Sequence, residues 1–301
     1  MVSAEARAEL DRMLAAKRQA EGRRPEPISV EQERRNWEAA ALETPLPEGA
    51  RFQSVDAGGV PSEWVEMPDV KRGRVVLLLH GGGYTSGSPV THRKLAANLG
   101  RAVNARVLVP HYRLAPEHPF PAGVEDAIKS YDWLLHQGLS EIVVAGDSAG
   151  GGLALSMLVA LRDAGAKLPR ATVLMSAWTD LTASSPSHVT HRDLDPQVTP
   201  EDLRSAGLLY VGAGDPAAPT ASTLFADPTG LPPLLLQVGG AEVLLDDSRI
   251  LAQRARAAGV VVTLRIFGGM WHVFQFHAPE MPEAQAAMDD IAAFIRAQLG
   301  D

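Results

Sequence analysis

The stretch Gly-Asp-Ser-Ala-Gly, residues 146–150, places a serine where an apolar run ends and a helical pattern begins. A strand–turn–helix of this kind is typical of a nucleophile elbow, which lifts a serine hydroxyl above the edge of a sheet. Negative charge that develops there is favoured by the N-terminus of the following helix. A tight turn whose serine only caps the helix is the alternative. We predict that Ser148 is a nucleophile.

Three consecutive glycines follow His80, at the end of the apolar run 75–79. Glycine loses more conformational entropy on folding than other residues, so such a run indicates backbone that must approach a ligand closely. A phosphate-binding loop is the alternative, but the glycine patterns of such loops are missing. We therefore expect the N–H groups of Gly82, Gly83 and Ala149 to form an oxyanion hole.

A serine nucleophile needs a base, and the chain order Ser, acid, His of this kind of site places the histidine last. Only His272 and His277 follow the candidate acids, and His272 lies five residues past the apolar run 261–267, on a glycine-containing loop. We predict His272 as the general base. We expect His277 to be a solvated or capping residue.

Three carboxylates follow the apolar run 233–238 and could orient the histidine. Asp246 and Asp247 open the helical pattern 246–258, where acidic side chains complement the helix dipole and cap free N–H groups. Glu242 has no such structural explanation. The sequence therefore favours Glu242 as the acid, with Asp246 as the alternative.

The elements that must hold these residues are short apolar runs alternating with helical patterns. Nearly continuous Val, Ile and Leu indicate strands buried on both faces, as in a parallel sheet covered by helices. We predict an α/β fold with a mostly parallel, twisted sheet of about eight strands, and a hairpin, 51–56 with 60–66, at its edge. The remaining predicted strands are 75–79, 105–110, 141–145, 171–176, 233–238 and 261–267. The predicted helices are 4–20, 29–41, 90–103, 121–137, 149–165, 200–211, 246–258 and 282–299.

Composition narrows the class of protein but does not separate an enzyme from a binding protein. A net charge of −8 gives no reason to expect nucleic acid or an anionic membrane surface as a partner. With no cysteine in 301 residues, disulfides, thiolate metal sites and a cysteine nucleophile are excluded. The start has no apolar signal core, and no run reaches the roughly 18 apolar residues of a membrane span. We expect a cytoplasmic location.

Several blocks, in this order, resemble the hormone-sensitive-lipase-like serine esterases of the α/β-hydrolase superfamily, also called bacterial family IV. The blocks are His80 to Gly83, 111–126, 146–154, 231–239 and 270–274. The resemblance implies a carboxylesterase acting on short- to medium-chain acyl esters through an acyl-enzyme, without cofactor or metal. The family's Asp-Pro-Leu-x-Asp block, laid on residues 242–246, puts its catalytic acid at Glu242. The chain departs from that block, with Glu for Asp and Val243 for Pro.

The resemblance also implies a helical cap over the catalytic core. Residues 1–48 and 177–213 would form the cap, and residues 49–176 and 214–301 the core. Tyr84, Trp178, Leu208 and Tyr210 are candidates for the substrate pocket, with packing in the core as the alternative for each.

Two further questions stay open in the sequence. A non-catalytic small-molecule receptor on the same fold, or an amidase or acyltransferase with the same triad, is an alternative to an esterase. The run 261–267 is expected at an edge of the sheet, where an unpaired strand can pair with another chain. We predict a homodimer through this strand.

Overall fold

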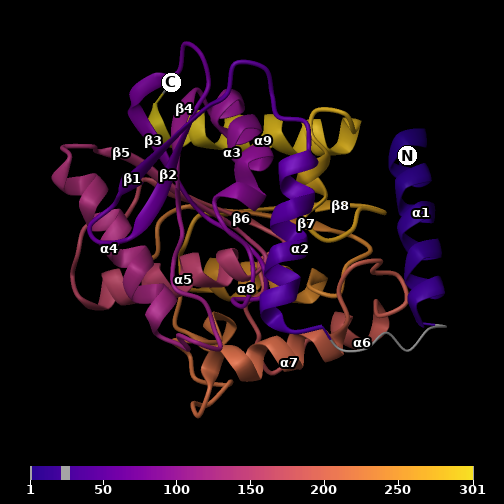
Figure 1. Cartoon of the computed structure of the whole chain (residues 1–301). Coiled ribbons are helices and arrows are strands. Elements are labelled where there is room, and N and C mark those ends of the chain that lie inside the picture. Colours follow the sequence, from indigo (N-terminus) through magenta and orange to yellow (C-terminus); the bar gives the residue numbers. More distant parts are fainter. Residues whose placement is uncertain (1, 22–27, 301) are drawn as a thin grey trace.

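The computed structural model describes residues 2–21 and 28–300, and its described strands form one sheet (Figure 1). The strands are β1 Arg51–Asp56, β2 Pro61–Glu66, β3 Lys71–Leu79, β4 Ala105–Pro110, β5 Glu141–Asp147, β6 Ala171–Met175, β7 Leu234–Gly239 and β8 Val262–Phe267. Their order in this eight-stranded sheet is β1-β2-β4-β3-β5-β6-β7-β8. β2 pairs antiparallel with β1 and β4, and all other neighbours are parallel. The predicted mostly parallel sheet, with a hairpin at one edge, is confirmed.

Helices surround this sheet and differ from the predicted ones by a few residues at their ends. The α-helices are α1 Ala4–Glu21, α2 Val30–Glu43, α3 Arg93–Val103, α4 Ala122–His136, α5 Ala149–Asp163, α6 Ser187–Thr190, α7 Pro200–Val211, α8 Leu245–Ala257 and α9 Pro282–Leu299. The short 3-10 helices are η1 Val90–His92, η2 Thr223–Phe225 and η3 Phe274–His277. Of these, α6, η2 and η3 were not predicted, because a single helical turn carries no apolar periodicity.

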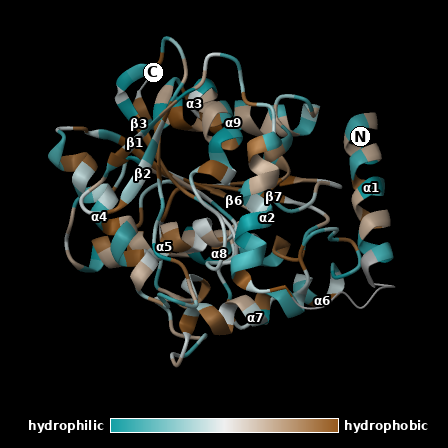
Figure 2. Cartoon of the chain, in the orientation of Figure 1, coloured by the Kyte–Doolittle hydropathy of each residue, from teal (hydrophilic) through white to brown (hydrophobic). Residues whose placement is uncertain are grey.

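The sheet separates two hydrophobic cores, one on each face. Along β3, Val75, Leu77 and Leu79 enter one core and Val76 and Leu78 the other, because successive side chains of a strand point to opposite faces. Residues of α4, α5 and α8 complete the first core, and residues of α3 and α9 the second. Figure 2 shows the central strands as a hydrophobic layer between helices with hydrophilic outer sides. Each fully buried Val or Leu side chain contributes roughly 1.5–3 kcal/mol to stability.

Two helices outside the sheet and its covering helices, α2 and α7, lie at the entrance to the candidate active site. α2 is fastened by Arg34, whose guanidinium donates to the carbonyl oxygens of Thr85 (2.6 Å) and Ala115 (2.8 Å) and pairs with Glu117 (2.8 Å). α7 begins with a capping box between Thr199 and Asp202. These helices come from residues 1–48 and 177–213, the two predicted cap segments, of which residues 1 and 22–27 lie outside the described part.

α1 runs along one side of the molecule, apart from α2 (Figure 1). The residue before it, Ser3, is tied to α9, since it donates from its N–H (2.6 Å) and its hydroxyl (2.8 Å) to the Glu283 carboxylate. Near the end of α1, Lys17 donates to the carbonyl oxygens of Arg192 (2.8 Å) and Asp195 (2.7 Å). None of the described helices is long and apolar enough to cross a membrane.

Candidate active site

The turn between β5 and α5 carries Ser148 in a strained backbone conformation. Its φ of 52° and ψ of −124° are rarely adopted by a residue with a side chain. Glycine is required on both sides. A Cβ on Gly146 would come within 2.3 Å of the Gly150 carbonyl oxygen, and one on Gly150 within 2.0 Å of the Leu79 carbonyl oxygen. The sequence therefore folds into the sharp turn that its motif predicts.

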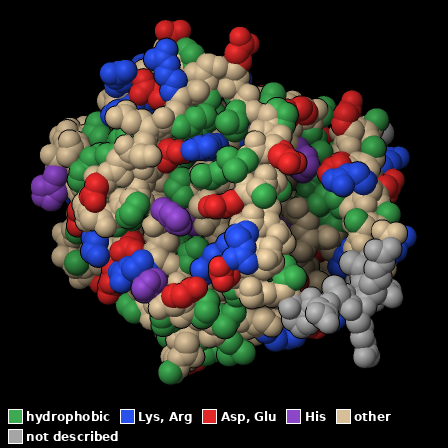
Figure 3. All heavy atoms as spheres, viewed as in Figure 1, with side chains coloured by type: hydrophobic (Ala, Val, Ile, Leu, Met, Phe, Trp, Pro, Cys, Tyr) green, Lys and Arg blue, Asp and Glu red, His purple; other side chains and the backbone are tan. Residues whose placement is uncertain are grey.

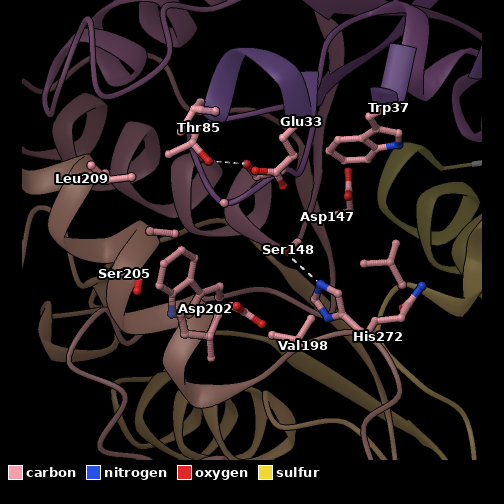
Figure 4. A pocket seen from close by; sticks show the side chains of 18 of the residues that line it. Glu33, Trp37, Thr85, Asp147, Ser148, Val198, Asp202, Ser205, Leu209 and His272 are labelled. Atoms are coloured by element: carbon pink, nitrogen blue, oxygen red, sulfur yellow. Dashed lines mark hydrogen bonds between the residues drawn. The ribbon is translucent and has the colours of Figure 1, made fainter. Parts of the chain in front are cut away.

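Ser148, His272 and Glu242 follow the carboxyl ends of β5, β8 and β7, and they meet above that end of the sheet. The Ser148 hydroxyl donates to His272 Nε2 at 2.9 Å (Figure 4). His272 Nδ1 in turn donates to Glu242 Oε2 at 2.9 Å. A hydroxyl, an imidazole and a carboxylate in this line can move a proton from the serine to the histidine.

The Glu242 side chain is fully buried and held by further donors. Its Oε1 accepts from the Ser176 hydroxyl at 2.8 Å and from the Gly239 N–H at 2.5 Å. Burial raises the pKa of Glu242, although its hydrogen bond to His272 works in the opposite direction. Burial disfavours the charged form of His272, but the hydrogen bond and charge of Glu242 outweigh it and raise the pKa of the imidazole. The carboxylate therefore makes His272 a stronger base than an isolated buried histidine.

The glycine loop lies beside the serine, with its backbone in conformations that glycine adopts easily. Gly82 and Gly83 have φ of 120° and 61°, and a Cβ on Gly82 would come within 2.3 Å of the Ser86 carbonyl oxygen. The loop is anchored by Gly81, whose N–H donates to Asp147 Oδ1 at 3.1 Å. The N–H groups of Gly82, Gly83 and Ala149 donate to no protein group in residues 2–21 and 28–300.

A cavity of about 690 Å³ opens above Ser148 and His272. Its walls come from α2, α7 and the loops at the carboxyl end of the sheet (Figure 4). The lining residues of α2 are Val30, Glu33 and Trp37, and those of α7 are Asp202, Leu203, Ser205, Ala206 and Leu209. Much of the remaining cavity lining consists of Gly82, Gly83, Thr85, Trp178, Gln197, Val198, Val273 and Phe276. Figure 3 shows acidic, basic and hydrophobic side chains interspersed over the outer face seen there.

The four predicted pocket residues have different positions. Trp178 lines the cavity. Tyr84 and Tyr210 are not among the lining residues: both are buried and stack on each other with ring centroids 3.7 Å apart, behind the wall. Leu208 is 61% exposed, and the next residue of α7, Leu209, lines the cavity in its place. A shift of one residue on a helix turns a side chain by about 100°, so a weakly patterned helix does not reveal its inner face.

The individual lining residues of α2 were not predicted, although the resemblance placed residues 1–48 in a cap over the core. Their helix is separated from the glycine loop by dozens of residues, and none of Val30, Glu33 and Trp37 belongs to a motif. The only signal was the isolated tryptophan in a polar helix. His277, expected to be solvated or capping, lines the cavity as well, and burial lowers the pKa of its imidazole.

The two aspartates that follow Glu242 lie in the first turn of α8, as expected, but their side chains differ. Asp246 pairs with Arg249 at 3.2 Å and does not reach His272. Asp247 is fully buried and turns away from its own helix, where it accepts from the N–H of Asp180 at 3.0 Å and lies 3.0 Å from His188 Nε2. The helix-start explanation therefore holds for the position of Asp247 and not for its hydrogen bonds.

Asp180, His188 and Asp247 form a buried cluster with donor atoms within 4.8 Å of one another. Both oxygens of Asp180 are already occupied by N–H and hydroxyl donors from Thr182 and Ser184, at 2.5–2.9 Å. With the Asp180 oxygens taken up by these donors and His188 Nε2 3.0 Å from Asp247 Oδ1, we interpret the cluster as a structural network rather than a metal site.

Fold and site together define an α/β-hydrolase, with a hydroxyl–imidazole–carboxylate line at the carboxyl end of a mostly parallel sheet. A family model described as "alpha/beta hydrolase fold" matches residues 76–276. An acetyl-hydrolase of Streptomyces hygroscopicus is 46% identical over 249 residues, 82% of this chain and 83% of its own.

Solved structures narrow the class further. A crystal structure of an esterase from the bacterial hormone-sensitive lipase family superposes with a TM-score of 0.92 and 44% identity, and the match covers 99% of both chains. A structure of EstE5, soaked with p-nitrophenyl butyrate, matches with a TM-score of 0.90 and 38% identity over 97% of this chain and 99% of the other. This chain belongs to the bacterial hormone-sensitive lipase family of the α/β-hydrolase fold, and it is a carboxylesterase.

Proposed function

We propose that this chain hydrolyses short- to medium-chain carboxylic esters through Ser148, His272 and Glu242, with an acyl-enzyme intermediate. The observation that carries the proposal is the line of two 2.9 Å hydrogen bonds from the serine hydroxyl through the imidazole to the buried carboxylate. Ser148 and His272 also line a cavity large enough for an ester.

In acylation, Ser148 Oγ bonds to the ester carbonyl carbon while its proton moves to His272 Nε2. The tetrahedral intermediate then expels the alcohol oxygen, which takes the proton from His272 and leaves the acyl group on Ser148. In deacylation, water repeats these steps and releases the carboxylic acid. Glu242 holds the imidazole by Nδ1 and stabilises its charge when it is protonated.

We infer that the N–H groups of Gly82, Gly83 and Ala149 receive the oxyanion. They lie on the two segments that border Ser148, and none of them donates to another group of the described chain. Each such donor contributes on the order of 10² to 10³ in rate in other enzymes.

The acyl-chain preference and the cap are parts of the same proposal. α2 and α7 wall the cavity, so residues 1–48 and 177–213 act as a cap over a core of residues 49–176 and 214–301. A cavity of about 690 Å³ suits a short or medium acyl chain and its alcohol. The acetyl-hydrolase name of one relative and the butyrate ester soaked into another are consistent with this size.

The test is hydrolysis of p-nitrophenyl acetate, butyrate, octanoate and palmitate by the full chain. We expect turnover that falls from the shorter to the longest acyl chain, with a burst of p-nitrophenol where deacylation is slow. Ser148→Ala should lose on the order of 10⁴ or more in kcat while its thermal midpoint stays near that of the parent. The absence of both a burst and turnover would support a receptor. Turnover of anilides above that of matched esters would support an amidase.

A further inference from the structure

The loop between α6 and α7 contains a fully buried carboxylate, Asp195, that the proposed mechanism does not use. Its Oδ1 accepts from the N–H groups of Gln197 (2.9 Å) and Val198 (3.0 Å). Its Oδ2 accepts from the N–H of Val243 at 2.9 Å. One side chain therefore joins the cap to the residue that follows Glu242.

Both ends of this connection belong to the site. Gln197 and Val198 line the cavity, on the wall that faces the substrate. Val243 continues the turn that begins at the carboxyl end of β7 and carries Glu242, the residue bonded to His272. A displacement of the loop that holds Asp195 therefore acts on the acid of the triad as well as on the cavity wall.

A second contact supports the same turn from the cap. The Ser187 hydroxyl donates to the carbonyl oxygen of Val243 at 2.6 Å and accepts from the N–H of Asp246 at 2.9 Å. Both the N–H and the carbonyl oxygen of Val243 are thus hydrogen-bonded to side chains of the cap. Buried backbone groups of this kind need hydrogen-bond partners, because an unpaired one has lost its bonds to water without replacement.

The identity of residue 243 makes this connection possible. The Asp-Pro-Leu-x-Asp block of the family that this chain resembles has proline at the matching position, and proline has no backbone N–H to donate. Val243 has one, and it donates to Asp195. The chain's departure from the Asp-Pro pattern thus comes with a backbone N–H that donates to the Asp195 carboxylate.

We propose that Asp195 is a positioning residue of the reaction, which couples the cap wall of the cavity to Glu242 through the N–H of Val243. This inference rests on the proposed Ser148–His272–Glu242 function. Asp195 touches neither substrate nor the reacting atoms. It acts by holding the turn on which the longer side chain of glutamate reaches His272 Nδ1.

The charge of Asp195 gives the proposal a readout that a purely structural role lacks. The acidic groups that raise the pKa of His272 are Glu242, Asp195 and Asp147. Asp195 also raises the pKa of Glu242. Removing the charge of Asp195 lowers the pKa of His272, so the acid limb of kcat/KM moves to lower pH.

The central variant is Asp195→Asn. Its amide oxygen can keep the two bonds to Gln197 and Val198, which maintains the cap turn, while its NH₂ group then faces the N–H of Val243 and cannot accept from it. We expect kcat to fall about 10- to 100-fold, as for a small misplacement of a catalytic group, with KM changed less than threefold. Asp193→Asn, an exposed carboxylate on the same loop, is the matched control and should leave kcat and the pH profile unchanged.

Val243→Pro removes the same hydrogen bond from the other side and leaves the charge of Asp195 in place. We expect a similar fall in kcat and no shift of the acid limb, since the charge remains. The kcat of the double variant should be little lower than that of either single variant, because both substitutions remove the same interaction. If Asp195→Asn does not fold, the fall in kcat of Val243→Pro still tests the proposal.

Three results would overturn the inference: an unchanged kcat for either folded variant, additive losses in the double variant, or the same pH shift in Asp193→Asn. Failure of the proposed function has a different signature. In that case the unmodified chain shows no ester turnover, or Ser148→Ala retains it.

Discussion

At the scale of single residues, the proposed triad acid, Glu242, is the point where this chain departs from the Asp-Pro-Leu-x-Asp block of the family it resembles. The glutamate side chain needs more room than that of aspartate. The turn that carries Glu242 accommodates it, and donors on that turn and its neighbours bind the second carboxylate oxygen. The Ser176 hydroxyl and the Gly239 N–H both donate to Oε1, which leaves Oε2 to accept from His272. The carboxylate is therefore fixed at both oxygens.

The first prediction compares Glu242→Ala with Asp246→Ala. Loss of Glu242 removes the partner of His272 Nδ1, so we expect kcat to fall by a factor on the order of 10³ to 10⁴. Asp246 pairs only with Arg249 near the surface, and we expect its removal to change kcat less than about threefold. Steady-state kinetics with p-nitrophenyl butyrate, alongside thermal unfolding of each variant, measures both. A large loss of kcat confined to Asp246→Ala would contradict the assignment.

The second prediction concerns pH. His272 accepts the serine proton only when it is neutral, so kcat/KM falls as the pH drops through the pKa of His272 in the folded protein. Because Glu242 raises this pKa, the acid limb should lie above the ordinary histidine value of about 6.5. In Glu242→Gln the charge is gone, and the limb should move to lower pH on a lower plateau. A limb that stays at the same pH in this variant would show that another group titrates.

At the scale of elements, α2 forms one wall of the cavity. Helix propensity alone does not hold this helix in place. It exposes most of its side chains and contains no fully buried residue. Its attachment depends on Arg34, which reaches the carbonyl oxygens of two loops beside the serine. One guanidinium can do this because its donors diverge in a rigid plane.

The third prediction follows from this attachment. Arg34→Ala should leave the carbonyl groups of Thr85 and Ala115 without their donor and loosen α2. We expect KM to rise several-fold, with kcat less affected, and the free energy of unfolding to fall by about 1 kcal/mol or more. Arg35→Ala is the matched control, since Arg35 pairs with exposed Glu31 on the outer side of the same helix. Equal effects of the two variants would refute the role of Arg34.

At the scale of the whole molecule, one edge of the sheet is open in the described chain. β8 pairs with β7 on one side, and beyond it no described strand follows. Val261 and Ile266 are 62% and 42% exposed at this edge. Apolar side chains on an unpaired edge strand favour pairing with a second copy.

The fourth prediction is therefore the homodimer through β8. Sedimentation at micromolar concentration should give twice the chain mass. Ile266→Lys should shift the protein to the monomer, because a charge would be buried in the contact. A monomeric parent protein would disprove the dimer. If Ile266→Lys stays dimeric, the interface does not lie at β8. Val189→Lys, at an exposed position of α6, serves as control.

Much of the fold and of the site core was predictable because the signals are local. Strands β3 to β7 carry continuous apolar runs, and the turn at Ser148 and the glycine loop have motifs that depend on the backbone within a few residues. Chain order then selected His272, and the helix start at Asp246 favoured Glu242.

What only the tertiary structure decided lies in contacts between distant segments. They are the inner face of α7, the presence of α2 residues in the cavity wall and the link from Asp195 to Val243. No local period or motif encodes such contacts, since each depends on side chains that approach only after the chain has folded. The sequence by itself thus determined the sheet and the proposed reacting groups, and the packing of α2, α7 and the loop before α7 determined what surrounds them.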